Sequence, residues 1–347
     1  MIKLSLQEYR EGGTEMNGRK KIYIISAISV LIIIIGLVIY NKSKVKYEWV
    51  LLEDGTYKAD TILIDKDVEN FKIPGRHLGR KVTQVGTLIQ PAVVSEQRLL
   101  KCVYIPDSVT YIKKFSMLDN LTTVTGGKNV EYIDKKAFFR LKHLEEMPYF
   151  PNLKYIGDQA FERSGIKKVE LSDTVEYIGL CAFSEIDLEE ISIPSGVKYI
   201  SGNAFCDTPW IDNQTGFVIE GDNILISYPN EETVVIPVGV KSIGLSRWEH
   251  TKVRKIYVPS TVTNYDNCLR LDKRSDELLE IYICPGAESD EEEEPLPNID
   301  EIKDEFLKGE YPNCMYVVEK GSRAEKYFSE LGEKCYRVVD KIEYPGE

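Results

Sequence analysis

The residues that most often carry out catalysis or bind metals are few and widely spaced in this sequence. Its three histidines are His77, His143 and His250, and none stands beside a serine or cysteine at a spacing typical of a nucleophile and its base. No pair of His or Cys residues has metal-ligand spacing. A catalytic triad formed in the fold by residues far apart in the sequence remains an open alternative. The spacing itself predicts neither a nucleophilic catalytic site nor a metal site.

The cysteines give no chemical motif either. The seven positions form no CxxC pair, and their odd number leaves at least one thiol over in any disulfide framework. A partial framework stays open, although we expect most of the cysteines to be small buried apolar residues. The positions are 102, 181, 206, 268, 284, 314 and 335.

Carboxylates and glycines are the remaining candidates for chemistry. The acidic residues fall at polar positions rather than among apolar neighbours that would raise a pKa, which disfavours glycoside hydrolysis. The segment "TGGKN" (125–129) is too short to cradle a phosphate. Residues 287–312 begin with an acidic run that could ligate Ca²⁺ but lacks the pattern of a calcium loop, so we expect a solvated insertion. The sequence therefore predicts no enzyme and no cofactor.

A repeated phrase dominates the chain and must position whatever site it has. "VEYIGLCAF" (175–183) stands between "LKYIGDQAF" 22 residues earlier and "VKYISGNAF" 22 residues later. Its Tyr-Ile pair recurs at intervals of 21 to 23 residues, and most copies close on Ala-Phe. The tyrosines are Tyr111, Tyr132, Tyr155, Tyr177 and Tyr199.

Each unit also holds a second short apolar run, often followed by a Pro turn such as "IPSGV" (193–197). One unit cannot bury its own apolar residues, but stacked units can, with strands of successive coils paired side by side. We therefore predict a β-rich solenoid of about 22-residue units with terminal caps, preceded by one transmembrane helix. Between 188 and 205 this predicts that Leu188, Ile191, Ile193, Val197, Ile200 and Phe205 point inward and that Glu189, Glu190, Ser192 and Lys198 face water.

The alternation of these phrases resembles the BspA-like, Treponema-type leucine-rich repeats of bacterial and protozoan surface proteins. The resemblance covers most of residues 48–340. Residues 47–86 are similar to the opening unit of that family, residues 210–244 to a hairpin-bearing repeat, and residues 315–340 to a closing cap. In that cap, Ser322 and Glu325 have the spacing of a capping box at the start of a helix. The resemblance implies adhesion or surface contact for some members, although the repeat is a fold rather than a function.

The tyrosine column is the candidate binding site. If the five rings face outward, they form an aromatic strip suited to recognition. The alternative is that each tyrosine is half-buried and packs on its neighbours. Before the tyrosines stand Thr110, Glu131, Lys154, Glu176 and Lys198, whose alternating charges favour pairing between coils more than a ligand.

The uncharged run from Ile22 to Tyr40 is long enough to cross a bilayer as a helix of about 28 Å. A cleaved signal peptide is the alternative, but no small-x-small cleavage site follows. The Arg19-Lys20-Lys21 cluster favours a cytosolic N-terminus, whether translation starts at Met1 or Met16. The remainder carries a net charge of −17, since residues 1–46 account for +5 of the total of −12, and this disfavours nucleic acid.

These observations predict the organisation and function of the whole chain. The parts are a cytosolic tail (1–21), a membrane span (22–40), a linker (41–46), an N-terminal cap and first repeat (47–86), a leucine-rich repeat solenoid (87–286), an acidic insertion (287–312) and a C-terminal cap (313–347). We expect a single-pass cell-membrane protein with its bulk extracytoplasmic, a non-catalytic scaffold that binds a protein or glycan ligand at the cell surface. The alternatives are a docking arm for another envelope protein and an enzyme acting on the cell wall.

Overall fold

The described part of the chain lies almost entirely in one of two units. The chain divides into Met1–Lys46 and Tyr47–Glu347. Among the described residues, no helix is long and apolar enough to cross a membrane. The expected span (22–40) and the expected acidic insertion (287–312) lie outside those residues. The computed structural model describes residues 44–65, 67–91, 99–245, 252–262, 278–285, 314–322, 324–326, 329 and 336–345.

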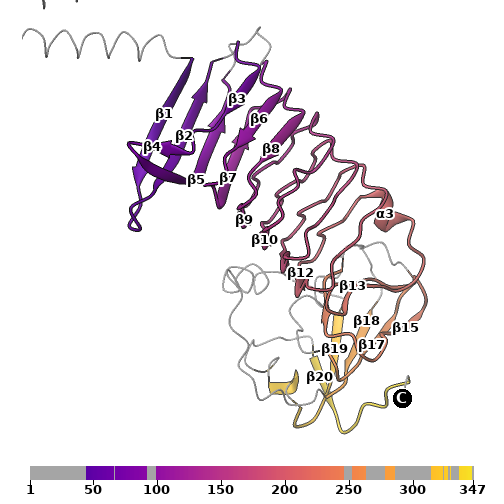
Figure 1. Ribbon diagram of the computed structural model, residues 1–347. Coiled ribbons are helices and arrows are strands. Elements are labelled where there is room, and N and C mark those ends of the chain that lie inside the picture. The colour runs from indigo at the N-terminus through magenta and orange to yellow at the C-terminus, as the bar shows by residue number, and fades with distance from the viewer. Residues whose placement is uncertain are drawn as a thin grey trace, which may run out of the picture. The chain divides into compact units, whose positions relative to one another are not determined.

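The longest sheet joins successive coils of the repeat (Figure 1). From β2 onward its strands are parallel, and each pairs with the equivalent strand of the next coil. The intervals of 21 to 23 residues predicted this pairing, since one coil separates equivalent positions. In spatial order the strands are β1 (Val45–Leu51), β2 (Tyr57–Ile64), β5 (Arg80–Ile89), β7 (Tyr111–Ser116), β9 (Tyr132–Ile133), β10 (Tyr155–Ile156), β11 (Tyr177–Ile178) and β12 (Tyr199–Ile200), with β4 (Arg76–His77) antiparallel to β5.

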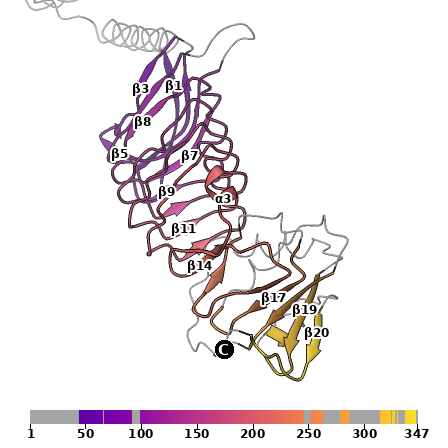
Figure 2. The same ribbon diagram turned by 90° about the vertical axis from the view of Figure 1, so that its right-hand side faces the viewer.

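The second apolar run of each coil lies across the core from this sheet (Figures 1 and 2). Its first three copies form a parallel sheet of β3 (Asn70–Lys72), β6 (Cys102–Ile105) and β8 (Thr123–Gly126). Later copies are reduced to single bridges, from Glu146 to Lys168 and from Lys168 to Glu190. Each coil thus contributes one segment to each side of the core.

After β12 the regular coils give way to a helix, a hairpin and a longer parallel sheet. The helix α3 (Pro209–Asp212) starts at Thr208, whose hydroxyl accepts from the N–H of Ile211. The strands β13 (Val218–Glu220) and β14 (Ile224–Ser227) form an antiparallel hairpin, and β14 pairs with β16 (Ser242–Ile243). The last sheet, all parallel, is β15 (Thr233–Val235), β17 (Lys255–Val258), β18 (Leu279–Ile283), β19 (Cys314–Glu319) and β20 (Tyr336–Val339).

The expected capping box is present after β19. The hydroxyl of Ser322 accepts from the N–H of Glu325 at 3.1 Å. In return, the Glu325 carboxylate accepts from the N–H of Gly321 at 2.5 Å, one residue before the cap. Residues 324–326 and 329 are helical. These bonds satisfy backbone donors that a helix start would otherwise leave unpaired.

Two kinds of buried residue fill the core of the regular coils. The isoleucine of each Tyr-Ile pair is almost fully buried, as is the Ala-Phe closure. Successive phenylalanine rings stack with centroid distances of 5.0 to 5.7 Å. Trp210 of α3 then meets the last ring edge-on at 5.0 Å. The stacked rings are Phe138, Phe161, Phe183 and Phe205.

The predicted orientation of residues 188–205 is confirmed at nine of the ten positions. Five of the six residues expected inside are buried, and Ile191 is half-buried. The four residues expected in water are all exposed.

The corners of the coils use left-handed backbone at residues other than glycine. One such position, three residues after the isoleucine, holds Lys136, Gln159, Cys181 and Asn203. A second, seven residues after it, holds Arg140, Arg163, Glu185 and Asp207, with φ between 54° and 60°. This conformation is unfavourable for side chains with a Cβ. Backbone N–H groups at both corners donate to the following coil, as from Arg140 to the carbonyl of Glu162 at 2.9 Å, which holds the strained turns in place.

We expect Ile178→Ala to lower the free energy of unfolding by about 2–5 kcal/mol, because the side chain is fully buried and the neighbouring coils cannot close over the cavity. The matched control is Lys198→Ala in the next coil, which is exposed and should change stability little. Urea denaturation of the purified full-length chain measures both. Equal effects of the two substitutions would contradict a continuous core.

A close approach between coils generates a second prediction. A Cβ added at Gly165 would lie 2.1 Å from the carbonyl oxygen of Lys142, a backbone atom that cannot move aside alone. Gly165→Ala should therefore destabilise the chain by about 1–3 kcal/mol. Gly202→Ala is the control, since its Cβ would meet only the carbonyl of Leu245, at 3.7 Å. If the thermal unfolding temperatures of the two variants coincide, the close approach does not exist.

Candidate functional site

The five tyrosines predicted as the candidate binding site lie in one column. Strand register places Tyr111 beside Tyr132, and each later tyrosine beside the next. Their rings stack with centroid distances from 4.1 to 5.3 Å and interplanar angles of 6° to 16°. The spacing of the phrase thus brings together side chains up to 88 residues apart in the sequence.

Burial favours ladder packing over an open aromatic strip. Tyr155, Tyr177 and Tyr199 are only 8%, 5% and 5% exposed, and they pack together as a cluster with Tyr132 at its edge. Tyr111 and Tyr132 are half-buried, so the N-terminal end of the column offers the most accessible aromatic surface. A binding role for the five tyrosines stays a prediction.

The two residues of each Tyr-Ile pair are both buried. Strict alternation from Val175 would place Tyr177 inward and Ile178 outward. Instead, Ile178 is fully buried and Tyr177 lies in the separate tyrosine cluster. The tyrosine rings of adjacent coils cover a face of each ring that would otherwise be exposed to solvent. Each coil therefore buries both residues of the pair.

Burial also changes the acidity of the tyrosines. Desolvation raises the pKa of Tyr155 and of Tyr177 well above the ordinary value, and neighbouring tyrosines add to this. The pKa of Tyr111 is raised by desolvation and by its hydroxyl, which donates to Asp134 Oδ2 at 2.6 Å. Tyr111, Tyr155 and Tyr177 are therefore harder to ionise than an ordinary tyrosine, which favours a packing role.

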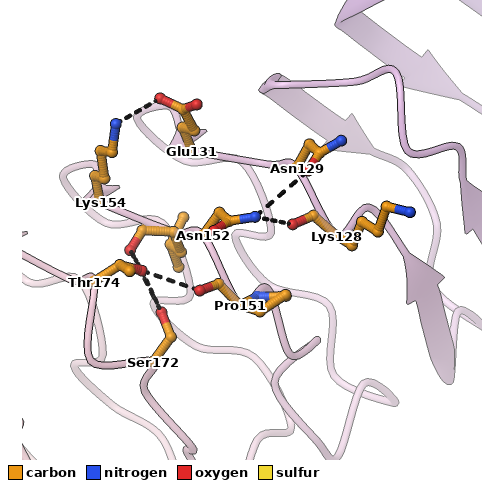
Figure 3. Close-up of polar contacts among 9 residues, drawn as sticks. Lys128, Asn129, Glu131, Pro151, Asn152, Lys154, Ser172 and Thr174 are labelled. Carbon is orange, nitrogen blue, oxygen red and sulfur yellow. Dashed lines mark hydrogen bonds and ion pairs between the residues drawn. The ribbon is translucent and has the colours of Figure 1, made fainter.

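Charged residues before the tyrosines form ion pairs between coils, as their alternating signs predicted. Lys154 Nζ lies 2.9 Å from Glu131 Oε2, and Lys198 Nζ lies 3.0 Å from Glu176 Oε2 (Figure 3 shows the first pair). Each side chain is about half exposed, so each pair contributes little to stability. Their effect is on register, because a coil slipped by one residue would place Lys154 beside Val130 or Tyr132 and lose the pair.

Sequence reasoning missed a second polar column, which lies three residues before the tyrosines. The amide of Asn152 donates to the carbonyl of Lys128 at 2.8 Å, and the hydroxyl of Thr174 donates to the carbonyl of Pro151 at 3.2 Å (Figure 3). In earlier coils, Ser108 and Asn129 make equivalent bonds to the carbonyls of Gly75 and Asp107. The signal was a polar residue three positions before four of the five tyrosines, with Gly196 before Tyr199, and it marks turn positions that bond to the preceding coil.

The cysteines and histidines form no metal-binding group within the described residues. The thiols of Cys102, Cys181 and Cys206 are half-buried, and that of Cys284 is buried. Burial raises the pKa of the Cys206 thiol to about 12, which keeps it protonated. The side chains of Cys268, Cys314 and Cys335 lie outside the described residues.

The described histidines are also separate from one another. His77 stacks on Trp49, with ring centroids 4.2 Å apart, and His143 bonds to a backbone carbonyl. His250 lies outside the described residues. Among the residues that the structure describes, no group of three or more His, Cys, Asp or Glu could hold a metal ion. The expectation of no metal and no cofactor stays a prediction for the whole chain.

Parallel coils of 21 to 23 residues with in-register apolar columns define a leucine-rich repeat protein. The sequence profile of the BspA-type leucine-rich repeat region matches in six copies, over residues 88–212 and 156–270, which together cover more than half of the chain. The chain belongs to this family, as the resemblance predicted.

Solved structures of three bacterial proteins are also similar to this chain. A leucine-rich repeat protein from Bacteroides ovatus is 18% identical over 71% of this chain and 70% of its own, with a TM-score of 0.43. A leucine-rich cell surface protein from Faecalibacterium prausnitzii is 18% identical, with coverages of 81% and 95% and a TM-score of 0.30. A leucine-rich repeat protein from T. pallidum is 19% identical, with coverages of 59% and 86% and a TM-score of 0.36. No curated protein matches the chain.

The raised tyrosine pKa values predict a loss of stability at alkaline pH. In the unfolded chain a tyrosine ionises near pH 10, whereas the fold keeps Tyr155 and Tyr177 protonated at higher pH. Above that pH the unfolded state binds fewer protons than the folded state, so stability falls as pH rises, by up to about 1.4 kcal/mol per tyrosine per pH unit. Urea denaturation at pH 9, 10 and 11 measures the slope.

The matched control for this prediction is the double variant Tyr155→Phe, Tyr177→Phe. It keeps the stacked rings but removes both titrating hydroxyls, while all lysines still titrate. Its stability should fall less steeply between pH 10 and pH 11 than that of the wild type. Parallel curves for the two proteins would mean that the rings are not buried as described.

Proposed function

We propose that this chain is a single-pass membrane protein whose repeat stack serves as a non-catalytic, extracytoplasmic binding scaffold for a protein or glycan at the cell surface. The observation that carries the proposal is the in-register stack itself. Its coils are joined by parallel pairing and by two buried aromatic columns, so the exposed side chains of successive coils stand in fixed rows. Rigid rows lower the entropy lost on binding.

Membership of the BspA-type family supports a binding role, since repeats of this kind generally present surfaces for recognition. The uncharged run from Ile22 to Tyr40 supports the membrane anchor, and the Arg19-Lys20-Lys21 cluster supports a cytosolic N-terminus. Adhesion is the form of binding that fits an anchored, outward-facing stack. The alternative of a docking arm inside the envelope requires the same anchor but not surface display.

Protease accessibility tests the display of the repeat stack. Proteinase K added to intact cells should remove residues 47–347 from an N-terminally tagged chain and leave a short membrane-bound fragment. A cytosolic protein in the same cells serves as the intactness control, and opened cells show that the chain is cleavable. If residues 47–347 are protected in intact cells but cleaved once the cells are opened, the surface scaffold is contradicted and the docking arm inside the envelope is supported.

The anchor is tested separately by extraction with alkaline carbonate. The full-length chain should remain in the membrane fraction, whereas a variant without residues 22–40 should be released. If the full-length chain is released as well, the proposed membrane anchor is wrong, even if proteinase K reaches the repeat stack in intact cells.

A further inference from the structure

A cationic hollow lies on the stack, and its lining residues do not include the five tyrosines of the column. Its volume is about 480 Å³, and its lining consists of Asp119, Arg140, Lys142, His143 and Arg163. All five lining residues carry a charged or polar group, and no large apolar side chain of the kind that anchors many bound peptides is among them. Three permanent cations in this lining outnumber its one carboxylate, that of Asp119.

Two of these cations lack an acidic partner. Arg163 is held by Glu185, with Nε and Nη2 2.8 and 2.7 Å from the two carboxylate oxygens. Arg140 and Lys142, by contrast, form no ion pair within the described part of the chain. The Arg140 guanidinium instead lies 4.9 Å from the ring centroid of Phe139. Both residues are exposed, so both are available to an external anion.

The coil backbone fixes the positions of the cations. Arg140 and Arg163 stand at the same corner of adjacent coils, where each N–H donates to a carbonyl of the following coil at 2.9 and 3.1 Å. The Nδ1 atom of His143 lies 2.5 Å from the carbonyl oxygen of Asp119. Because a carbonyl only accepts, Nδ1 carries the proton and the bond ties the ring to the preceding coil. Like charges on adjacent coils repel each other, and a bound anion relieves this repulsion.

The charge of the neighbouring coils limits which anion fits. Residues 99–168 hold twelve Lys and Arg against eight Asp and Glu, whereas residues 169–245 hold two against thirteen. At the corner of Arg140 and Arg163, the next two coils present Glu185 and Asp207. Coils repeat about every 4.8 Å, so a dense polyanion such as duplex nucleic acid lying along the stack would meet this acidic half within about 10 Å. A flexible anionic chain that crosses the stack, instead of lying along it as a stiff duplex would, avoids this acidic half.

We propose that this hollow binds an acidic polysaccharide through a sulfate or carboxylate group, with Arg140 and Lys142 as its contacts. The guanidinium of Arg140 is suited to two parallel hydrogen bonds to such a group, and Lys142 supplies a second charge. The proposal deepens the proposed function, and it rests on it because a surface glycan meets the hollow only if the stack is displayed. Binding by the purified chain does not require display, so the two proposals fail separately.

The test uses the full-length chain in non-ionic detergent with fluorescein-labelled dextran sulfate as the probe and neutral dextran of the same size as the comparison. Fluorescence anisotropy should show binding to dextran sulfate alone, weakening as salt rises. The variant Arg140→Gln, Lys142→Gln should bind at least about tenfold more weakly, because charged hydrogen bonds are lost. The control Lys154→Gln, Lys198→Gln removes the same charge elsewhere on the stack and should weaken binding by less than about twofold.

Three results would overturn the assignment. One is the absence of dextran sulfate binding by the wild type. Another is equal weakening in both double variants, which would mean that net charge alone attracts the probe. The third is tighter binding to labelled poly-glutamate than to dextran sulfate, which would make an acidic peptide the ligand class. Matching thermal unfolding temperatures for the wild type and both variants ensure that folding does not cause the difference.

Discussion

In-register parallel pairing between successive coils is the constraint on which the rest of the described stack depends. It places each residue beside its equivalent one coil away, so that a repeated side chain becomes a column. Two aromatic columns follow from it, the phenylalanines in the core and the tyrosines outside it. A slip of one residue would move each column to the wrong face and lose both together. The two columns therefore specify register more strongly than either would alone.

The interactions between coils differ widely in free energy. The strong ones stabilise the stack, and the weak ones mainly affect the register of the coils. A buried phenylalanine contributes about 1.5–3 kcal/mol by leaving water, whereas an exposed ion pair contributes about 0–1 kcal/mol. The apolar columns thus hold the coils together, while pairs such as Glu131 with Lys154 mainly disfavour slipped registers. Because exposed charges carry little of the stability, they can change from coil to coil. The repeat stack can accordingly be cationic over residues 99–168 and acidic over residues 169–245 without loss of its core.

The sequence predicted the columns because an interval of about 22 residues is visible without knowledge of the third dimension. It also predicted the exposed and buried sides of residues 188–205 and the bond between Ser322 and Glu325. It did not predict the left-handed corners, since Lys136 and Arg140 stand where glycine or asparagine would have marked such a turn. Bonds to the next coil impose that backbone, and they exist only after stacking. The burial of Tyr155 and Tyr177 has the same origin, because the covering atoms belong to other coils.

Positions that hold the coils together differ from positions that are suited to recognition. Tyrosine recurs in five coils because each ring packs on the next, so the residue that is most conspicuous in the sequence is mainly a packing residue. The corner seven residues after the isoleucine behaves oppositely, since its backbone is the same in four coils while its side chain changes from arginine to glutamate and aspartate. A fold that fixes the backbone and leaves the side chain free allows charge to be placed one coil at a time. Under the proposed binding function, specificity is therefore better sought at the variable corners of the repeat stack than in its repeated phrase.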